Sequence, residues 1–333
     1  MSEKKPIMAV TMGDPGGVGA EIILKAFRDD GLWQGVTPVV YGDMARLKAL
    51  VEPNVLPIEL VPVEDPSAAE GIFPKLAVID FENVGVDFPY GQISAEAGRA
   101  ALDYIEAAAK AALAGEVAAL VTAPISKEAI RKAGSSFTGH TDMLAAMAGT
   151  SRYAMTLVAG SLRAVFATAH IPLGDVAATL TRRRVLECIE LSAEALKLLG
   201  ESDANIAVLG LNPHAGEGGF LGSEEDEVIV PAIREAKQKG INCDGPVPAD
   251  TAFYRMKGGE FGICVAMYHD QGHAPLKLVA FETGVNWTVG LPFIRTSPDH
   301  GTAFDIAGTG KARSESFRAA YSHAKRLVIG KSF

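Results

Sequence analysis

Short apolar runs that alternate with longer amphipathic stretches are the feature that most constrains the fold of this 333-residue chain. The runs are rich in Val, Ile, Ala and Leu, a composition typical of strands buried on both faces of a sheet. We expect strands at 7–12, 39–41, 76–81, 118–122, 156–159, 164–167, 206–211 and 263–268, and helices at 94–116, 182–199, 224–237 and 315–328. Ser94 is a candidate N-cap, and Gly200 can end the second helix. This alternation predicts an α/β fold with a largely parallel or mixed sheet.

Composition and charge exclude several classes of protein. The length allows roughly two domains of ~150 residues, but no repeat, low-complexity tract or Pro-rich linker separates two halves. A formal net charge of -9 disfavours general nucleic-acid binding, which needs a basic surface. The sequence has no run of ~18 apolar residues that would span a membrane and no signal-peptide core at its start. The three distant cysteines (Cys188, Cys243 and Cys264) are typical of reduced, buried thiols, so we expect a cytoplasmic protein. The acidic charge and the lack of a long apolar run predict no nucleic-acid or membrane partner.

Glycine is concentrated in three clusters, at 13–19, 216–222 and 301–310, and the first two follow predicted strands. Glycine after a strand lets backbone N–H groups approach an anion or a flat ring closely, although a tight strand-to-helix turn explains a single cluster equally well. None of the clusters is a complete G-x-G-x-x-G, and none has the Gly-Lys-Ser/Thr ending of a P-loop. The usual Rossmann fingerprint is therefore absent, and any nucleotide must be held in another way.

Three histidines follow predicted strands: His170, His214 and His269. Ligands of open α/β sheets bind beyond the carboxyl ends of the strands, where three imidazoles could hold Zn²⁺ or a similar divalent cation. The alternative is that each is a hydrogen-bonded, half-buried histidine, and spacing alone does not decide between the two. His269 and His273 would form an i,i+4 pair on a helix, but the residues between and after them, Gly272 and Pro275, predict that no helix forms there.

A second group of residues is suited to anion binding. His140 and Thr141 follow a glycine at a predicted helix start, where backbone N–H groups favour a phosphate or carboxylate. Lys277, Asn286 and Arg295 lie later in the chain, and an arginine can hold either group through two parallel hydrogen bonds. Solvated surface charge is the alternative for Lys277 and Arg295, but both stand among apolar residues.

Seven ordered blocks of sequence resemble the 4-hydroxythreonine-4-phosphate dehydrogenase (PdxA) family over nearly the whole chain. A set of seven in the same order is far more specific than any one motif. The blocks are TMGDPGGVG at 11–19, TAPISK at 122–127, TGHT at 138–141, LNPHAGEGG at 211–219, PADTAF at 248–253, YHDQG at 268–272 and GLPFIRT at 290–296.

The resemblance implies a homodimeric, NAD-dependent oxidoreductase that uses a divalent cation (Zn²⁺, Mg²⁺, Mn²⁺ or Co²⁺). It also implies two α/β/α domains with a central mixed sheet, similar to isocitrate and isopropylmalate dehydrogenases, and an active site in the cleft between them. We place the first domain at 1–125 plus 285–333 and the second at 126–284. On this resemblance His170, His214 and His269 hold the metal, with ligands shared across the dimer.

The same resemblance assigns the remaining site residues. Substrate contacts map onto His140, Thr141, Lys277, Asn286 and Arg295. The segment 299–310 is similar to the cofactor loop of isocitrate and isopropylmalate dehydrogenases. The expected cofactor residues are Gly301, Thr302 and Asp305 in that loop, with Gly216 and Gly218 in an earlier glycine cluster. Candidates for the general base are Lys127 and Asp250, for which a structural ion pair is the alternative.

One stretch departs from the pattern of the vitamin B6 enzyme. Residues 273–277 read His-Ala-Pro-Leu-Lys, which looks like the paralogous branch that acts on 4-phospho-D-threonate or 4-phospho-D-erythronate. We therefore expect oxidation of such an acid at C3 and decarboxylation to dihydroxyacetone phosphate and CO₂. The alternatives are 4-hydroxy-L-threonine phosphate dehydrogenase of pyridoxal phosphate biosynthesis, a cis-dihydrodiol dicarboxylate dehydrogenase, and a non-catalytic protein that binds metal or phosphate.

Overall fold

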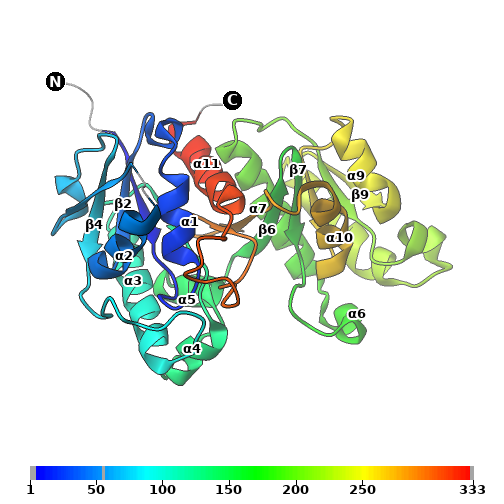
Figure 1. Ribbon diagram of the computed structural model, residues 1–333. Coiled ribbons are helices and arrows are strands. Elements are labelled where there is room, and N and C mark those ends of the chain that lie inside the picture. Colours follow the sequence, from blue (N-terminus) through cyan, green and yellow to red (C-terminus); the bar gives the residue numbers. More distant parts are fainter. Residues whose placement is uncertain (1–4, 55–56, 331–333) are drawn as a thin grey trace. The chain divides into compact units, whose positions relative to one another are not determined.

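The computed structural model describes residues 5–54 and 57–330 (Figure 1). Its contacts divide the chain into two compact units. Unit 1 combines Met1–Ser151 with Leu291–Ile329, and Arg152–Gly290 makes up most of unit 2. The two units are defined by which residues contact one another, and this is not a test of where folding domains begin and end. The domain boundaries expected after residues 125 and 284 therefore stay a prediction.

Unit 1 contains six parallel strands in the order β3-β4-β2-β1-β5-β12. Every residue of β1, β2 and β5 is buried, as expected for a parallel sheet covered on both faces. Helix α3 packs on β1, β2 and β5, while α11 packs on β5 and β12. The strands are β1 (Ile7–Thr11), β2 (Thr37–Gly42), β3 (Glu59–Pro62), β4 (Lys75–Asp80), β5 (Ala119–Thr122) and β12 (Ile294–Pro298), and the helices are α1 (Gly19–Ala26), α2 (Met44–Asn54), α3 (Ala95–Leu113), α4 (Lys127–Lys132), α5 (His140–Met147) and α11 (Glu315–Ile329).

Unit 2 contains six strands in the order β11-β6-β7-β10-β8-β9. Strands β11, β6 and β7 pair antiparallel, whereas β7, β10, β8 and β9 pair in parallel, so this arrangement is mixed. The strands are β6 (Ala154–Ala159), β7 (Leu162–Phe166), β8 (Ile206–Leu209), β9 (Cys243–Val247), β10 (Ile263–Ala266) and β11 (Val285–Val289), and the helices are α6 (Val176–Thr179), α7 (Arg182–Leu198), α8 (Val230–Gln238), α9 (Ala249–Lys257) and α10 (His269–Ala280). Short helical turns occur at Asp30–Trp33, Pro66–Ala68, Leu173–Asp175, Pro213–Gly219 and Glu225–Ile229.

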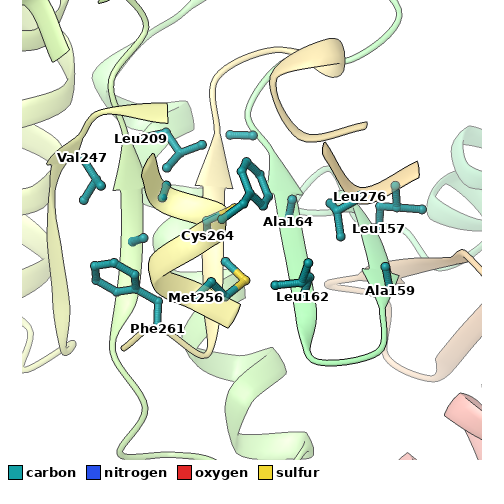
Figure 2. Packing of buried hydrophobic residues seen from close by; sticks show 14 of the residues in the cluster. Leu157, Ala159, Leu162, Ala164, Leu209, Val247, Met256, Phe261, Cys264 and Leu276 are labelled. Carbon is teal, nitrogen blue, oxygen red and sulfur yellow. The ribbon is translucent and has the colours of Figure 1, made fainter. Parts of the chain in front are cut away.

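The apolar core of unit 2 lies between its strands and helices α9 and α10. Figure 2 shows Leu209 and Cys264 of neighbouring strands beside Met256 of α9 and Leu276 of α10. All four side chains are almost completely buried, and each one buried contributes on the order of 1.5–3 kcal/mol through removal from water. The three cysteines are buried and free, as the sequence predicted.

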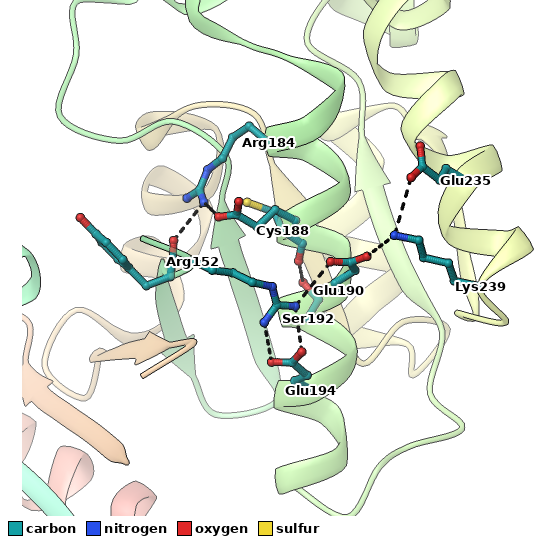
Figure 3. A network of polar contacts seen from close by, with 10 residues as sticks. Arg152, Arg184, Cys188, Glu190, Ser192, Glu194, Glu235 and Lys239 are labelled. Carbon is teal, nitrogen blue, oxygen red and sulfur yellow. Dashed lines mark hydrogen bonds and ion pairs between the residues drawn. The ribbon is translucent and has the colours of Figure 1, made fainter. Parts of the chain in front are cut away.

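A chain of exposed ion pairs joins α7 to its surroundings (Figure 3). Arg152 Nη2 lies 2.8 Å from Glu194 Oε1 and 3.5 Å from Glu190 Oε2. Lys239, just after α8, lies 2.7 Å from the other oxygen of Glu190 and 3.6 Å from Glu235. Exposed pairs of this kind contribute about 0–1 kcal/mol each.

The eight expected strands and four expected helices all form, with end shifts of a few residues. Ser94 does cap α3, because its side chain accepts a hydrogen bond from the Ala97 amide at 3.0 Å. The region 224–237 begins as a π-helical turn before α8. The sequence analysis missed β3, β9, β11 and β12, which contain polar residues or proline. No helix in the described ranges has the length and apolar character needed to cross a membrane.

The absence of a helix after β10 was wrongly predicted, since α10 runs through both Gly272 and Pro275. Glycine is required at position 272 because a Cβ there would lie 2.6 Å from the Phe166 ring. A proline inside a helix costs ~3 kcal/mol. Burial of Leu276 and the hydrogen bonds of the buried Gln271 amide with Met267 and Gly210 offset that cost. His269 and His273 therefore are an i,i+4 pair, with parallel rings whose centres lie 3.7 Å apart.

Candidate functional site

In unit 1, two glycine-rich loops lie against each other at the carboxyl end of β1. The loop after β1 turns at Gly13, which has a φ of +74° and whose Cβ would lie 2.4 Å from the Pro124 carbonyl oxygen. The Thr302 carbonyl, in the expected cofactor loop, accepts a hydrogen bond from the Val18 amide at 3.0 Å. A side chain at Gly17 would also reach Thr302, so glycine permits this approach. Gly301 and Asp305 of the same loop are exposed.

Asp14 is a buried carboxyl group in the loop after β1 that the sequence analysis did not single out. Its Oδ1 accepts a hydrogen bond from the Gly16 amide at 2.8 Å, and its side chain is inaccessible to solvent. Burial raises the pKa of Asp14 to about 6, although hydrogen bonds from the backbone of Gly16 and Ser126 oppose the rise. Its position within the first glycine cluster was the available signal.

The expected anion-binding residues of unit 1 are brought together at the ends of β5 and β12. Arg295 is 2% exposed, and its Nη2 donates to the Thr122 hydroxyl at 2.7 Å. Burial lowers the pKa of Arg295 to about 9, so its guanidinium keeps its charge at neutral pH. Burial lowers the pKa of His140 well below its usual value, and the charge of Arg295 lowers it further. His140 is therefore neutral at pH 7, beside a buried cation.

Helix α5 begins at His140, as expected, and places His140 and Thr141 in its first turn. Asp142 accepts hydrogen bonds from the Gly139 amide at 3.0 Å and the Thr138 amide at 2.6 Å. This carboxylate holds the turn that leads into the helix. Within the described residues, His140 Nε2 is buried and has no hydrogen-bond partner. A buried ring nitrogen without a hydrogen-bond partner, close to the charged Arg295, is suited to a hydrogen bond with a polar group of a bound ligand.

In unit 2, the three expected metal ligands follow three adjacent parallel strands. His170 comes after β7, His269 begins α10 directly after β10, and His214 follows β8. His170 and His214 are exposed and His269 is half-buried. The ring centres of His170 and His269 lie 5.7 Å apart. The described part of a single chain contains no group of three His, Cys, Asp or Glu side chains placed to hold one ion.

The donor chemistry of these histidines fits a divalent cation. Nδ1 of His269 lies 2.6 Å from Asp270 Oδ1, a contact in which Nδ1 carries the hydrogen and the carboxylate accepts it. This assigned tautomer leaves the lone pair of Nε2 for a ligand, the arrangement common among metal-binding histidines. His214 stands in a left-handed backbone stretch, with φ between 45° and 79° at each of residues 214–218. Gly216 and Gly218, expected at the cofactor, belong to the same stretch.

The remaining expected residues have distinct environments. Lys277 on α10 lies with Nζ 6.0 Å from the centre of the Phe281 ring. Oδ1 of Asn286 on β11 is buried without a hydrogen-bond partner in the described ranges. Lys127 begins α4 and Asp250 lies in the first turn of α9, and both are exposed. Neither forms an ion pair with any described residue, and their role as general base stays a prediction.

Comparison with known proteins identifies the family. Residues 34–324 match the family model described as "Pyridoxal phosphate biosynthetic protein PdxA". The chain is 44% identical to D-threonate 4-phosphate dehydrogenase of Salmonella typhimurium strain LT2 over 323 residues, covering 96% of this chain and 98% of the relative. It is 42% identical to 4-hydroxythreonine-4-phosphate dehydrogenase of Trichlorobacter lovleyi over 335 residues, covering 98% and 99%. A crystal structure of 4-hydroxythreonine-4-phosphate dehydrogenase from Klebsiella pneumoniae superposes with a TM-score of 0.91 at 42% identity, covering 98% and 99%.

Proposed function

The chain belongs to the PdxA family of dehydrogenases, and from this premise we propose that it oxidises a 4-phosphorylated 3-hydroxy acid at C3 with NAD and a divalent cation. The preferred substrates are 4-phospho-D-threonate and 4-phospho-D-erythronate. The keto acid formed at C3 then loses its carboxyl group, which yields dihydroxyacetone phosphate and CO₂. The observation that carries the substrate class is the buried cation Arg295 beside neutral His140.

The anion-binding residues would hold the phosphorylated acid. A guanidinium that is already out of water forms stronger hydrogen bonds to a phosphate or carboxylate than an exposed one does. Arg295, His140 and Thr141 supply such donors in unit 1, and Lys277 and Asn286 are the proposed contributions of unit 2. The buried, unpaired Oδ1 of Asn286 would accept a substrate hydroxyl hydrogen.

His170, His214 and His269 would hold the metal, with ligands shared between two subunits. A bound divalent cation polarises the C3 hydroxyl and stabilises the charge that develops on loss of CO₂. Asp270 keeps Nε2 of His269 available for this role by accepting the hydrogen on Nδ1. Since imidazole suits several divalent cations, Zn²⁺, Mg²⁺, Mn²⁺ and Co²⁺ all belong in the test.

The proposed cofactor contacts are glycine-rich segments that follow strands β12 and β8. Gly301, Thr302 and Asp305 in unit 1 are proposed NAD contacts, and Gly216 and Gly218 are proposed for unit 2. When bound, NAD accepts the hydride from C3. The proton of the C3 hydroxyl would pass to Lys127 or Asp250, which are exposed and therefore accessible to a substrate.

A homodimer is also proposed, and large apolar side chains on unit 2 support it. Leu278 is 88% exposed, Phe281 77% and Tyr254 82%. These residues lie on α9 and α10 or directly after it, in the unit that carries the histidines. Contiguous exposed apolar groups mark interaction surfaces, and these residues are the proposed members of such a surface between the two chains. Sedimentation equilibrium would give twice the chain mass, and substitution of Leu278 and Phe281 by serine would give single chains.

The names of two relatives favour a second candidate, 4-hydroxy-L-threonine phosphate dehydrogenase. This substrate carries an amine at C2 where the phosphorylated sugar acids carry a hydroxyl. The deciding experiment offers 4-phosphorylated C4 acids to the purified protein with each metal and records NADH formation. The proposal predicts the highest kcat/KM with 4-phospho-D-threonate or 4-phospho-D-erythronate. A higher value with 4-hydroxy-L-threonine phosphate would transfer the assignment to the second candidate, and no NADH with any of these acids would refute both.

A further inference from the structure

A buried carboxylate in unit 2 holds the loop that carries His214. Glu225 is 3% exposed and begins the π-helical turn before α8. Its Oε1 accepts hydrogen bonds from the Leu211 and Asn212 amides, both at 2.8 Å, and its Oε2 accepts one from Asn212 Nδ2 at 2.9 Å. One side chain therefore fixes the backbone two residues before His214.

The glycines of the loop fit closely around this carboxylate. A Cβ at Gly216 would lie 2.6 Å from Glu225 Oε2, and one at Gly210 would lie 3.3 Å from Oε1. His214, Ala215 and Glu217 adopt left-handed φ values that cost L-residues on the order of 1–2 kcal/mol each. Hydrogen bonds to a charged acceptor are among the strongest in proteins, so Glu225 can stabilise this backbone conformation.

A second buried side chain connects this loop to α10. Gln271 is 8% exposed, and its Nε2 donates to the Gly210 carbonyl at 2.7 Å. Its Oε1 accepts from the Met267 amide at 2.7 Å, two residues before His269. The backbone that precedes His214 and the backbone that precedes His269 are therefore held by the same amide group.

We propose that Glu225 and Gln271 are positioning residues that fix the loops bearing His214 and His269 for metal binding. This inference rests on the proposed function, because it requires the two histidines to be ligands. Neither Glu225 nor Gln271 reaches the metal in this account, and both act through backbone groups. Residues of this kind typically change metal affinity by 10–100-fold when they are replaced.

The test compares Glu225→Gln with Glu224→Gln in the intact protein. Glutamine keeps the size of the buried side chain but places an NH₂ group where Glu225 Oε2 accepts from Asn212. Glu224 contacts the side chain of Asn212 at 2.7 Å and no loop amide, so it is the matched control. Zinc affinity is measured by competition with a chromophoric chelator, at a temperature far below unfolding. We expect Glu225→Gln to weaken zinc binding by ~10–100-fold and Glu224→Gln by less than ~3-fold.

A pair of glycines in the same loop provides an independent test of the positioning role. Gly216 and Gly218 both have positive φ, but only a side chain at Gly216 would meet Glu225, since nothing lies within 4 Å of a Cβ at Gly218. Gly216→Ala should therefore weaken zinc binding more than Gly218→Ala. Gln271→Leu removes the hydrogen bonds of this side chain to the Met267 amide and the Gly210 carbonyl. This variant should weaken zinc binding by a factor similar to that of Glu225→Gln. The absorption spectrum of bound Co²⁺ should change in Glu225→Gln and Gln271→Leu.

The outcomes separate this inference from the proposed function. If His214→Ala leaves zinc affinity unchanged, His214 is not a ligand and the proposed metal site fails. If His214→Ala abolishes binding while Glu225→Gln and Gln271→Leu lower only the free energy of unfolding, the metal site stands and the positioning role is refuted.

Discussion

The anion-binding residues of unit 1 and the histidines of unit 2 are prepared for their ligands in opposite ways. Arg295 is 2% exposed, and the neighbouring His140 has a buried Nε2 and a pKa that burial lowers well below its usual value. His170 and His214 are exposed, and a left-handed backbone stretch at residues 214–218 sets the position of His214. On the proposed function, desolvation would support anion binding in unit 1, and loop geometry would support metal binding in unit 2.

The largest expected effect comes from removing a histidine of unit 2. His214→Ala should abolish metal retention and lower kcat/KM by at least ~1,000-fold, because the polarisation of the C3 hydroxyl would be lost. Elemental analysis measures the metal content of the variant, and the rate of NADH formation measures its kcat/KM. Full activity without bound metal would overturn the mechanism.

In unit 1, the pH dependence of the free energy of unfolding tests how strongly Asp14, in the loop after β1, is desolvated. The pKa of Asp14 is about 6 in the folded protein, above its unfolded value of 3.8, so the folded state binds the proton more tightly. Stability from this group is full below pH ~4 and is lost as pH rises through about 6, by about 3 kcal/mol. Asp14→Asn should remove that loss.

Urea unfolding of both proteins between pH 4 and pH 8 measures this difference. The free energy of unfolding of Asp14→Asn should exceed that of the original protein at pH 8 and match it near pH 4. A constant difference across this range would show that Asp14 does not titrate as described.

Removing the buried guanidinium tests the anion site directly. Arg295→Ala should raise KM for a phosphorylated substrate by ~10–100-fold, because hydrogen bonds to a charged group contribute about 1.5–3 kcal/mol. Thr122→Val is the control, since it removes one hydrogen bond of Arg295 but not its charge. An unchanged KM in Arg295→Ala would make this residue purely structural.

The smallest effect belongs to the exposed ion pairs on α7, outside both sites. Glu194→Gln removes the negative charge that faces Arg152, which donates to the two oxygens of Glu194 at 2.8 Å and 3.1 Å, and should lower the free energy of unfolding by less than ~1 kcal/mol. The loss should shrink in high salt, as thermal unfolding at two salt concentrations would show. A larger, salt-independent loss would mean that this network stabilises the protein more than exposed pairs do.

Apolar runs in the sequence predicted the fully buried strands well, but they predicted half-buried strands and helix α10 less well. Apolar runs identify β1, β5 and β10, because a strand covered on both faces needs apolar residues at every position. The runs do not identify β9 (Cys-Asp-Gly-Pro-Val), whose residues 244 and 245 are exposed and which ends the strand order of its unit. They also give the wrong result for α10, since burial outweighs the local cost of Pro275.

The candidate site was predictable in its residue types and much less so in its contacts. Arg295 meets Thr122 although 173 residues separate them, a pairing set by neighbouring strands and not by local sequence. Glu225 and Gln271 were missed because glutamate and glutamine are usually exposed, and only the fold shows that they are buried. The left-handed stretch at 214–218 was also out of reach, because His, Ala and Glu rarely adopt that conformation.

The central claim is metal-dependent oxidation of a 4-phosphorylated acid with NAD. The most direct test is NADH formation from 4-phospho-D-threonate by the purified protein, measured as isolated, after chelation, and after metal is restored. The account predicts that NADH forms, that chelation stops it, and that Zn²⁺, Mg²⁺, Mn²⁺ or Co²⁺ restores it with one dihydroxyacetone phosphate released per NADH. Undiminished NADH formation in the metal-free protein, or none with the metal restored, would contradict it.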